Sequence, residues 1–117
     1  MTDHIIVRRL RVPTRVGATD EERVAPQQVL VTLEIACDTT RAGKSDDLAD
    51  TIDYDRLVSQ VAEQVRTSET NLLEALAHKV AAYISTIAGV HGVTVEIAKE
   101  SPPVAEELGE VAIRIER

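Results

Sequence analysis

A two-residue alternation of apolar and polar side chains runs through residues 27–38, with Leu30 and Ala36 as exceptions, and it sets the strongest limit on the fold. Successive side chains of a β-strand point to opposite faces, so this pattern predicts a strand with one buried face and one polar face. The apolar face consists of Val29, Val31, Leu33, Ile35 and Cys37. The sheet that contains this strand therefore needs a second layer of structure over its apolar side.

Three other segments have strand character. Residues 3–16 are rich in β-forming residues but alternate imperfectly, and two shorter alternating segments close the chain. The apolar positions of these segments are Leu10, Val12, Val93, Val95, Ile97, Val111, Ala112, Ile113 and Ile115. Ser101, Pro102 and Pro103 separate the last two segments, because proline cannot continue a strand ladder.

Two amphipathic helices are predicted between the second and third strands, over residues 55–66 and 72–88. Apolar residues recur there every three or four positions, which is typical of a helix with one buried face. The two stripes are Leu57, Val58, Val61 and Val65, then Leu73, Leu76, Val80, Ile84 and Ile87. Gly89 is placed to end the second helix. In the polar connection before the first helix, Ser45 with Asp46 and Asp47 could open one helical turn.

The predicted order is β-β-α-α-β-β, which indicates an α+β fold with a four-stranded antiparallel sheet and both helices on one face. The length of 117 residues fits a single domain over residues 1–117. Four strands leave two sheet edges, and long edges favour pairing between subunits or closure into a barrel. The polar segment 17–26 between the first two strands is long enough to carry function.

Charge and cysteine content exclude several classes of function. The formal charge of −7 repels nucleic acid and anionic membranes, so neither is expected as a partner. Cys37 is the only cysteine, which excludes an intramolecular disulfide and a thiolate metal site. His4, His78 and His91 lie far apart without metal-ligand spacing, so we expect no metal site.

The location of the protein is predicted from its apolar segments. Arg8, Arg9 and Arg11 interrupt the short apolar stretch near the start, unlike the core of a signal peptide. No apolar run approaches the roughly 20 residues that span a bilayer. We therefore expect a cytoplasmic protein.

Four motifs match a known family in order and in spacing. They are AGKSDDLADTIDY at 42–54, NLLEALA at 71–77, KESPP at 99–103, and Gly17 with Glu22 and Gln27. Together they cover essentially the whole chain, which resembles the dihydroneopterin aldolase family. The resemblance implies the tunnelling fold (T-fold), in which subunits join their sheets into a barrel ring. It also implies a homo-oligomer, a tetrameric ring or stacked homo-octamer, with active sites between subunits.

The resemblance also implies an activity. Members of the family cleave 7,8-dihydroneopterin by a retro-aldol reaction into 6-hydroxymethyl-7,8-dihydropterin and glycolaldehyde, a step of folate biosynthesis. They need no metal, no lysine Schiff base and no other cofactor, and some also epimerise the substrate at C2′. The pterin substrate is therefore the expected small-molecule partner.

Two departures leave alternatives open. This chain has Val16 before Gly17 where the family often has histidine, and Val104 follows the lysine–proline loop where Pro-Gly-His is common. One alternative is a dihydroneopterin triphosphate 2′-epimerase, whose substrate needs nearby cations. Arg8, Arg9, Arg11 and Arg15 could supply them, although the last three share strand parity and could form only a solvated face. The other alternative is a pterin-binding relative without turnover.

Glu74 is the expected pterin anchor. A pterin presents a ring N–H and an amino group side by side, and one carboxylate can accept both hydrogen bonds. The resemblance assigns this role to Glu74. From spacing alone, Asn71 could instead be an N-cap, with Glu74 folding back as the partner in a capping box.

The resemblance assigns catalysis to Lys99, Tyr54 and Glu22. Lys99 would exchange protons with the substrate, which a lysine does best when burial lowers its pKa. Tyr54 would reach the neighbouring subunit's site, and Glu22 would orient the substrate's glycol side chain or a water. The plainer alternatives are a solvated lysine, a tyrosine packed on the first helix, and an ordinary acidic loop. Further pterin contacts are implied for Ala18, Thr19, Ile52 and Leu73, whereas Tyr83 is interpreted as packing.

Overall fold

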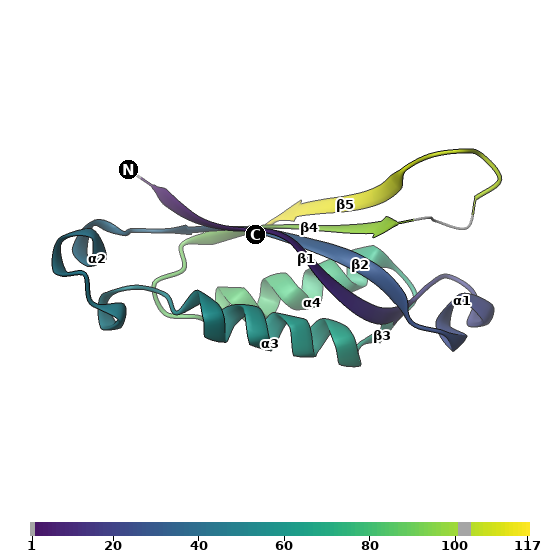
Figure 1. Ribbon diagram of the computed structural model, residues 1–117, viewed down its shortest axis with the longest axis horizontal. Helices are drawn as coiled ribbons and strands as arrows, with labels where there is room; N and C mark the ends of the chain where they lie inside the picture. Colours follow the sequence, from purple (N-terminus) through teal and green to yellow (C-terminus); the bar gives the residue numbers. More distant parts are fainter. Residues whose placement is uncertain (1, 101–103) are drawn as a thin grey trace.

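The computed structural model describes residues 2–100 and 104–117, so the predicted break at Ser101, Pro102 and Pro103 lies outside the described residues. The elements are β1 (Asp3–Val16), α1 (Asp20–Val24), β2 (Gln27–Cys37), α2 (Thr40–Ser45), the 3-10 helix η1 (Leu48–Asp50), α3 (Tyr54–Thr67), β3 (Glu69–Thr70), α4 (Leu73–Ser85), β4 (Gly92–Glu100) and β5 (Glu110–Glu116). Helices α3 and α4 cover one face of a curved sheet, while α1 and α2 lie at opposite ends of the molecule (Figure 1). The predicted α+β class and helix layer are confirmed.

The sheet has the strand order β3-β1-β2-β4-β5. Its four long strands are antiparallel, which confirms the predicted four-stranded sheet, and β3 adds a short parallel strand that was not predicted. Two residues are too few to give a periodic signal in a sequence. Strand β3 pairs Glu69 and Thr70 with the end of β1, and Gly17 N donates to Thr70 O at 3.2 Å. This pairing fixes the end of β1 beside the start of α4.

The core lies between the sheet and the two long helices. The predicted apolar face of β2 is buried throughout, from Val29 to Cys37. The stripes of α3 and α4 pack against it, although Val58 and Ile87 are only partly buried. The Thr14 hydroxyl donates to Val65 O at 2.6 Å and ties β1 to the end of α3. Burial of aliphatic area therefore drives this assembly, as the alternation and the helical stripes predict.

A β-bulge interrupts β1. Val7 pairs with Leu33 and Leu10 with Val31, so two residues of β1 oppose one residue of β2. Arg9, in the bulge, has φ 57°, and its N–H donates to the Thr32 hydroxyl at 3.1 Å. The extra residue shifts the alternation by one, and apolar side chains on both sides of the bulge then pack against the core. The imperfect alternation of this segment is thereby explained.

Two boundaries differ from the predictions. Helix α4 ends at Ser85 rather than Ala88, and tight turns carry the chain to Gly89, whose φ is +90°. Gly89 therefore serves the turn after the helix and does not end the helix itself. Ser45 ends α2, which was not predicted, and Asp47 opens η1 by accepting a hydrogen bond from Ala49 N at 2.9 Å.

Candidate active site

A shallow pocket of about 270 Å³ opens where α4 begins. It lies at the junction of the end of β1, the end of β4 and the start of β5. Its lining residues are Val16, Ala18, Glu22, Asn71, Leu72, Leu73, Glu74, Lys99, Val104 and Val111. Five predicted site residues, from the first polar loop, the start of α4 and the end of β4, therefore meet in one place.

Lys99 lies near the C-terminal end of β4. It continues the alternation of Val93, Val95 and Ile97, so its side chain points to the helix side of the sheet. The residue is 8% exposed, and its ammonium donates to Glu22 Oε2 at 2.9 Å. A buried ammonium needs such a partner because its desolvation is otherwise costly. The alternative of a solvated lysine is wrong.

Glu22 lies within the short helix α1. The hydrogen bond donated by Lys99 lowers the pKa of Glu22 below its ordinary value, while burial opposes this shift. Glu21 is exposed, so Glu22 is the glutamate that this loop directs inward. The Thr19 hydroxyl accepts from Glu22 N at 3.2 Å and caps the helix. Thr19 therefore supports Glu22, and its side chain is not part of the pocket lining.

Gly17 allows the close approach of Glu22. A Cβ at position 17 would lie 2.2 Å from the Cβ of Glu22 and 2.9 Å from its Oε2. Non-bonded atoms do not approach this closely, so only glycine, which has no Cβ, permits this packing. The Gly17–Glu22 motif therefore has a steric cause.

Glu74 occupies the first turn of α4 and is exposed at the mouth of the pocket. The N-cap is Leu72 without a side-chain cap, so the capping-box alternative with Asn71 is wrong. Within residues 2–100 and 104–117, the Glu74 carboxylate makes no hydrogen bond or ion pair. Both of its oxygens can accept hydrogen bonds from a ligand, and the helix N-terminus favours its negative charge.

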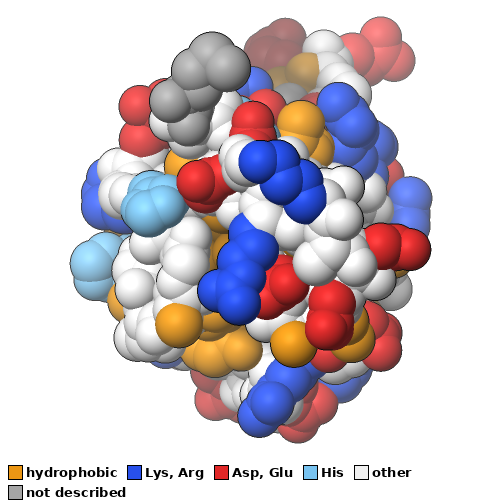
Figure 2. Space-filling model, turned by 90° about the vertical axis from the view of Figure 1, so that its left-hand side faces the viewer, with side chains coloured by type: hydrophobic (Ala, Val, Ile, Leu, Met, Phe, Trp, Pro, Cys, Tyr) orange, Lys and Arg blue, Asp and Glu red, His pale blue; other side chains and the backbone are white. Residues whose placement is uncertain are grey.

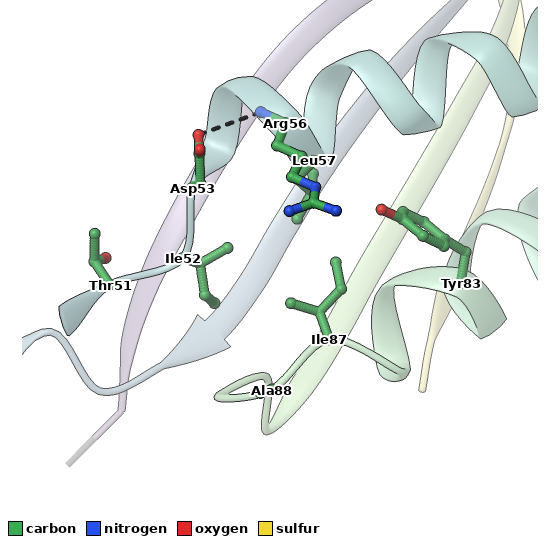
Figure 3. Close-up of a pocket in the computed structure, with 8 residues that line it drawn as sticks. All are labelled: Thr51, Ile52, Asp53, Arg56, Leu57, Tyr83, Ile87 and Ala88. Atoms are coloured by element: carbon green, nitrogen blue, oxygen red, sulfur yellow. Dashed lines mark hydrogen bonds between the residues drawn. The ribbon is translucent and has the colours of Figure 1, made fainter. Parts of the chain in front are cut away.

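Tyr54 and Ile52 lie apart from this pocket. Tyr54 begins α3 at the opposite end of the molecule and is 64% exposed. Ile52 lines a second hollow of about 320 Å³, in which Arg56 of α3 and Tyr83 of α4 point toward one another (Figure 3). One subunit therefore does not bring Tyr54 or Ile52 to Glu74, and their contribution to a neighbour's site stays a prediction. Tyr83 is partly buried against the core, which confirms its interpretation as packing.

Several residues near the pocket were not predicted from the sequence. Asn71, Leu72, Val104 and Val111 line it. Asn71 and Leu72 belong to the matched motif 71–77, but the resemblance gives neither of them a role, and the two valines carry no signal of a site. Arg23 and Gln27 hold the loop that carries Glu22 through hydrogen bonds to backbone carbonyls. Gln27 fitted the family pattern, whereas Arg23 in an acidic segment is typical of a solvated surface.

Cys37 is buried, as expected, and burial raises the pKa of its thiol. It lies beside a hollow at the α2 end of the molecule, remote from Lys99. Among the described residues, no three His, Cys, Asp or Glu side chains gather in a way that could hold a metal ion.

An antiparallel sheet with two helices on one face is the arrangement expected of a protein of the tunnelling fold. Two solved structures share this arrangement over 98% of this chain. A Vibrio cholerae protein assigned as a dihydroneopterin aldolase has a TM-score of 0.91 at 33% identity, with 96% of that chain covered. Escherichia coli dihydroneopterin aldolase in complex with neopterin has a TM-score of 0.90 at 28% identity, with 98% of that chain covered.

The family follows from the sequence comparisons. The family model described as dihydroneopterin aldolase matches residues 5–116. The dihydroneopterin aldolase of Methylorubrum extorquens is 34% identical over 118 residues, covering 100% of this chain and 91% of the relative. The chain belongs to the dihydroneopterin aldolase family, which confirms the resemblance seen in its motifs.

Proposed function

We propose that this chain is a dihydroneopterin aldolase that cleaves 7,8-dihydroneopterin into 6-hydroxymethyl-7,8-dihydropterin and glycolaldehyde. The observation that carries the proposal is the meeting of a free carboxylate, Glu74, and a buried ammonium–carboxylate pair, Lys99 and Glu22, in one pocket. Membership of the family supplies the reaction. Its substrate resembles the neopterin held by the Escherichia coli relative.

Glu74 is proposed to anchor the flat ring. Its carboxylate accepts one hydrogen bond from the pterin ring N–H and one from the neighbouring amino group. Leu73 and Val16 provide apolar walls for the ring faces, and backbone groups near Ala18 complete the contacts. The small volume of the pocket suits a bicyclic heterocycle whose side chain extends toward Lys99.

The proposed reaction is a retro-aldol cleavage. Transfer of the 2′ hydroxyl proton to a water breaks the C1′–C2′ bond and releases glycolaldehyde. The electron pair of that bond moves into the ring imine, which takes a proton at N5. A later gain of a proton at C1′, with loss of the proton from N5, restores the imine and completes the hydroxymethyl group. Lys99 is held as an ammonium by Glu22, so it is suited to donate a proton to the substrate. Glu22 is in turn suited to orient the glycol hydroxyls or a water.

The charge of the pocket favours an unphosphorylated substrate. Among the described lining residues, Lys99 is the one cation, and Glu22 already neutralises it. Glu74 then leaves the pocket negative, which would repel a triphosphate. Two of the four arginines that the epimerase alternative invokes are engaged elsewhere: Arg11 pairs with Glu100 at 2.8 Å, and Arg15 donates to carbonyls of α1.

We further propose a homo-oligomer, a tetrameric ring or an octamer of two rings, with active sites between subunits. Within the described residues, β5 pairs only with β4, and β1 pairs beyond β2 only with the two residues of β3, so both edges can accept another strand. Tyr54 and Leu48 are exposed at the α2 end, 64% and 63% respectively. Figure 2 views this end, where acidic and basic side chains are interspersed with hydrophobic ones. Such a surface suits contact with the next subunit.

One further prediction concerns location. None of the described helices is both long enough and apolar enough to cross a bilayer. A cytoplasmic location stays a prediction.

One assay tests the proposed reaction. Purified protein is incubated with 7,8-dihydroneopterin or with its triphosphate, and glycolaldehyde and the pterin products are measured. Glycolaldehyde from the unphosphorylated substrate supports the aldolase. Epimerisation of the triphosphate without glycolaldehyde would support the isomerase, and binding without either product would indicate a non-catalytic relative.

A further inference from the structure

The loop that carries Glu22 is not held by the hydrophobic core. Helix α1 has only five residues, and none of them is buried. Val24, its one large apolar residue, is 72% exposed. Yet Glu22 must lie within hydrogen-bond distance of Lys99, which the sheet fixes rigidly. Polar contacts must therefore set the position of the loop.

Arg23 makes the central contact. Its guanidinium donates to Gly17 O at 2.6 Å and also pairs with the exposed carboxylate of Asp20. Gly17 N in turn donates to Thr70 O at 3.2 Å, so the backbone of Gly17 is held from both sides. Because Glu22 packs directly on Gly17, fixing the glycine also fixes the glutamate.

Two other side chains brace the same loop. The Gln27 amide donates to Glu22 O at 3.1 Å and to Val16 O at 3.3 Å. Arg15 donates to Arg23 O at 3.3 Å and also to Val24 O. These are carbonyls near the C-terminal end of α1, which lack partners within so short a helix. Arg15 is therefore half-buried against α1 and is not part of a solvated face.

We propose that Arg23 is a positioning residue, which holds Glu22 against Lys99 by closing the loop onto the Gly17 carbonyl, with Arg15 and Gln27 as its supports. Arg23 does not line the pocket and so acts only through Glu22. A displacement of about 1 Å at a catalytic group is enough to slow a reaction markedly. The kinetic part of this inference rests on the proposed aldolase activity, whereas the geometric part does not.

The test compares Arg23→Gln with two matched controls. Arg66→Gln removes an arginine from another i,i+3 pair, with Glu63 on α3, which is remote from the pocket. Asp20→Asn removes the exposed ion pair of Arg23 but keeps its bond to Gly17. Arg23→Lys keeps the charge and one donor, so it serves as the conservative rescue. Each protein is assayed for glycolaldehyde release, and the Glu22 carboxyl is titrated by ¹³C NMR, with Glu22→Gln identifying its signal.

We expect Arg23→Gln to lower kcat by about tenfold or more while KM stays within about twofold, because Glu74 lies on a different element. The pKa of Glu22 should rise toward its ordinary value, since the bond from Lys99 that depresses it is lost. Both controls should match the wild type, and Arg23→Lys should recover most of kcat and of the pKa shift.

A wild-type pKa for Glu22 in Arg23→Gln overturns the inference, even if kcat falls, because Glu22 would then not have moved. Equal kcat in Arg23→Gln and Arg66→Gln also overturns it. If the wild-type protein releases no glycolaldehyde, the proposed function fails, and the NMR titration alone still decides whether Arg23 positions Glu22.

Discussion

The ammonium of Lys99 lies 2.9 Å from the carboxylate of Glu22, although 77 positions separate the two residues. The lysine extends from a central strand of the sheet, whereas the glutamate sits in a loop with no buried side chain. The pair therefore joins an inner strand of the sheet to a loop that polar contacts hold. Each property of this pair can be tested separately.

The pair predicts a pH-dependent contribution to stability. The folded-state pKa of Glu22 is below its ordinary value of 4.5, so the pair stabilises the protein fully above pH 4.5 and less as pH falls through the folded-state pKa. Glu22→Gln should cost about 1 kcal/mol near neutral pH. Urea unfolding of both proteins from pH 7 to pH 3 should show this difference shrinking below pH 4.5. A difference that stays constant to pH 3 would contradict the assignment.

Glu74→Ala is expected to abolish pterin binding without loss of stability. The carboxylate has no partner among the described residues, so its removal breaks no internal contact. Loss of two charge-assisted hydrogen bonds should weaken neopterin binding by about 3 kcal/mol or more. Fluorescence titration with neopterin and thermal unfolding measure both effects, and Glu63→Gln on α3 is the surface control. Unchanged affinity in Glu74→Ala would remove Glu74 as the anchor.

Lys99→Met is expected to retain binding and lose turnover. Methionine keeps most of the buried aliphatic volume but cannot exchange a proton. Glycolaldehyde release should fall by about a hundredfold or more, whereas neopterin affinity should change by less than about threefold. Full turnover in this variant would rule out the proposed role of Lys99.

Gly17→Ala should disable the site while the core remains intact. The new methyl group would overlap Glu22, and the loop must move because the clash involves the Cβ of Glu22 rather than a flexible tip. We expect a loss of about 1–3 kcal/mol in stability and at least about tenfold in kcat. Gly43→Ala in α2 is the control, since nothing lies within 4 Å of its Cβ, and it should be neutral or slightly stabilising. Equal kcat in the two variants would refute the steric argument.

Mixed oligomers test the sharing of sites between subunits. Tyr54→Phe and Glu74→Ala should each inactivate the protein when present in every subunit. Coexpressed in equal amounts, they should restore about a quarter of wild-type activity, because that fraction of interfaces combines two intact residues. Glycolaldehyde release from the purified mixture measures this recovery. No recovery in verified mixed oligomers would place both residues in the same subunit's site.

The sequence predicted the parts of the fold that burial of apolar area dictates. The alternation of β2 and the stripes of α3 and α4 survive in the structure because each buried face recurs over many residues. Strand β3 and helix α2 were missed, since elements of two and six residues have no measurable period. The end of α4 was placed too late because Ile87 extends the apolar stripe into the following turn.

The candidate site was predicted from the family motifs, and residue type and spacing alone would not have indicated it. From residue type alone, Glu22 would be assigned to a solvated loop and Lys99 to a strand end. The family resemblance predicted that both belong to one site. Arg15 and Arg23 could not be predicted, because their partners are backbone carbonyls whose directions depend on the folded loop. Tyr54 lies far from the pocket of its own subunit, so a single chain cannot test its role.

The bulge at Arg9 determines which side chains of β1 face the core. Without it, the present sequence in uninterrupted pleating would turn Ile5 and Val7 toward the side that carries Arg11. A related chain that lacks the extra residue would instead keep the same apolar side chains on the core side with no bulge. Comparisons of related sequences must therefore keep this insertion in register before they assign any position of β1 to the inside or the outside.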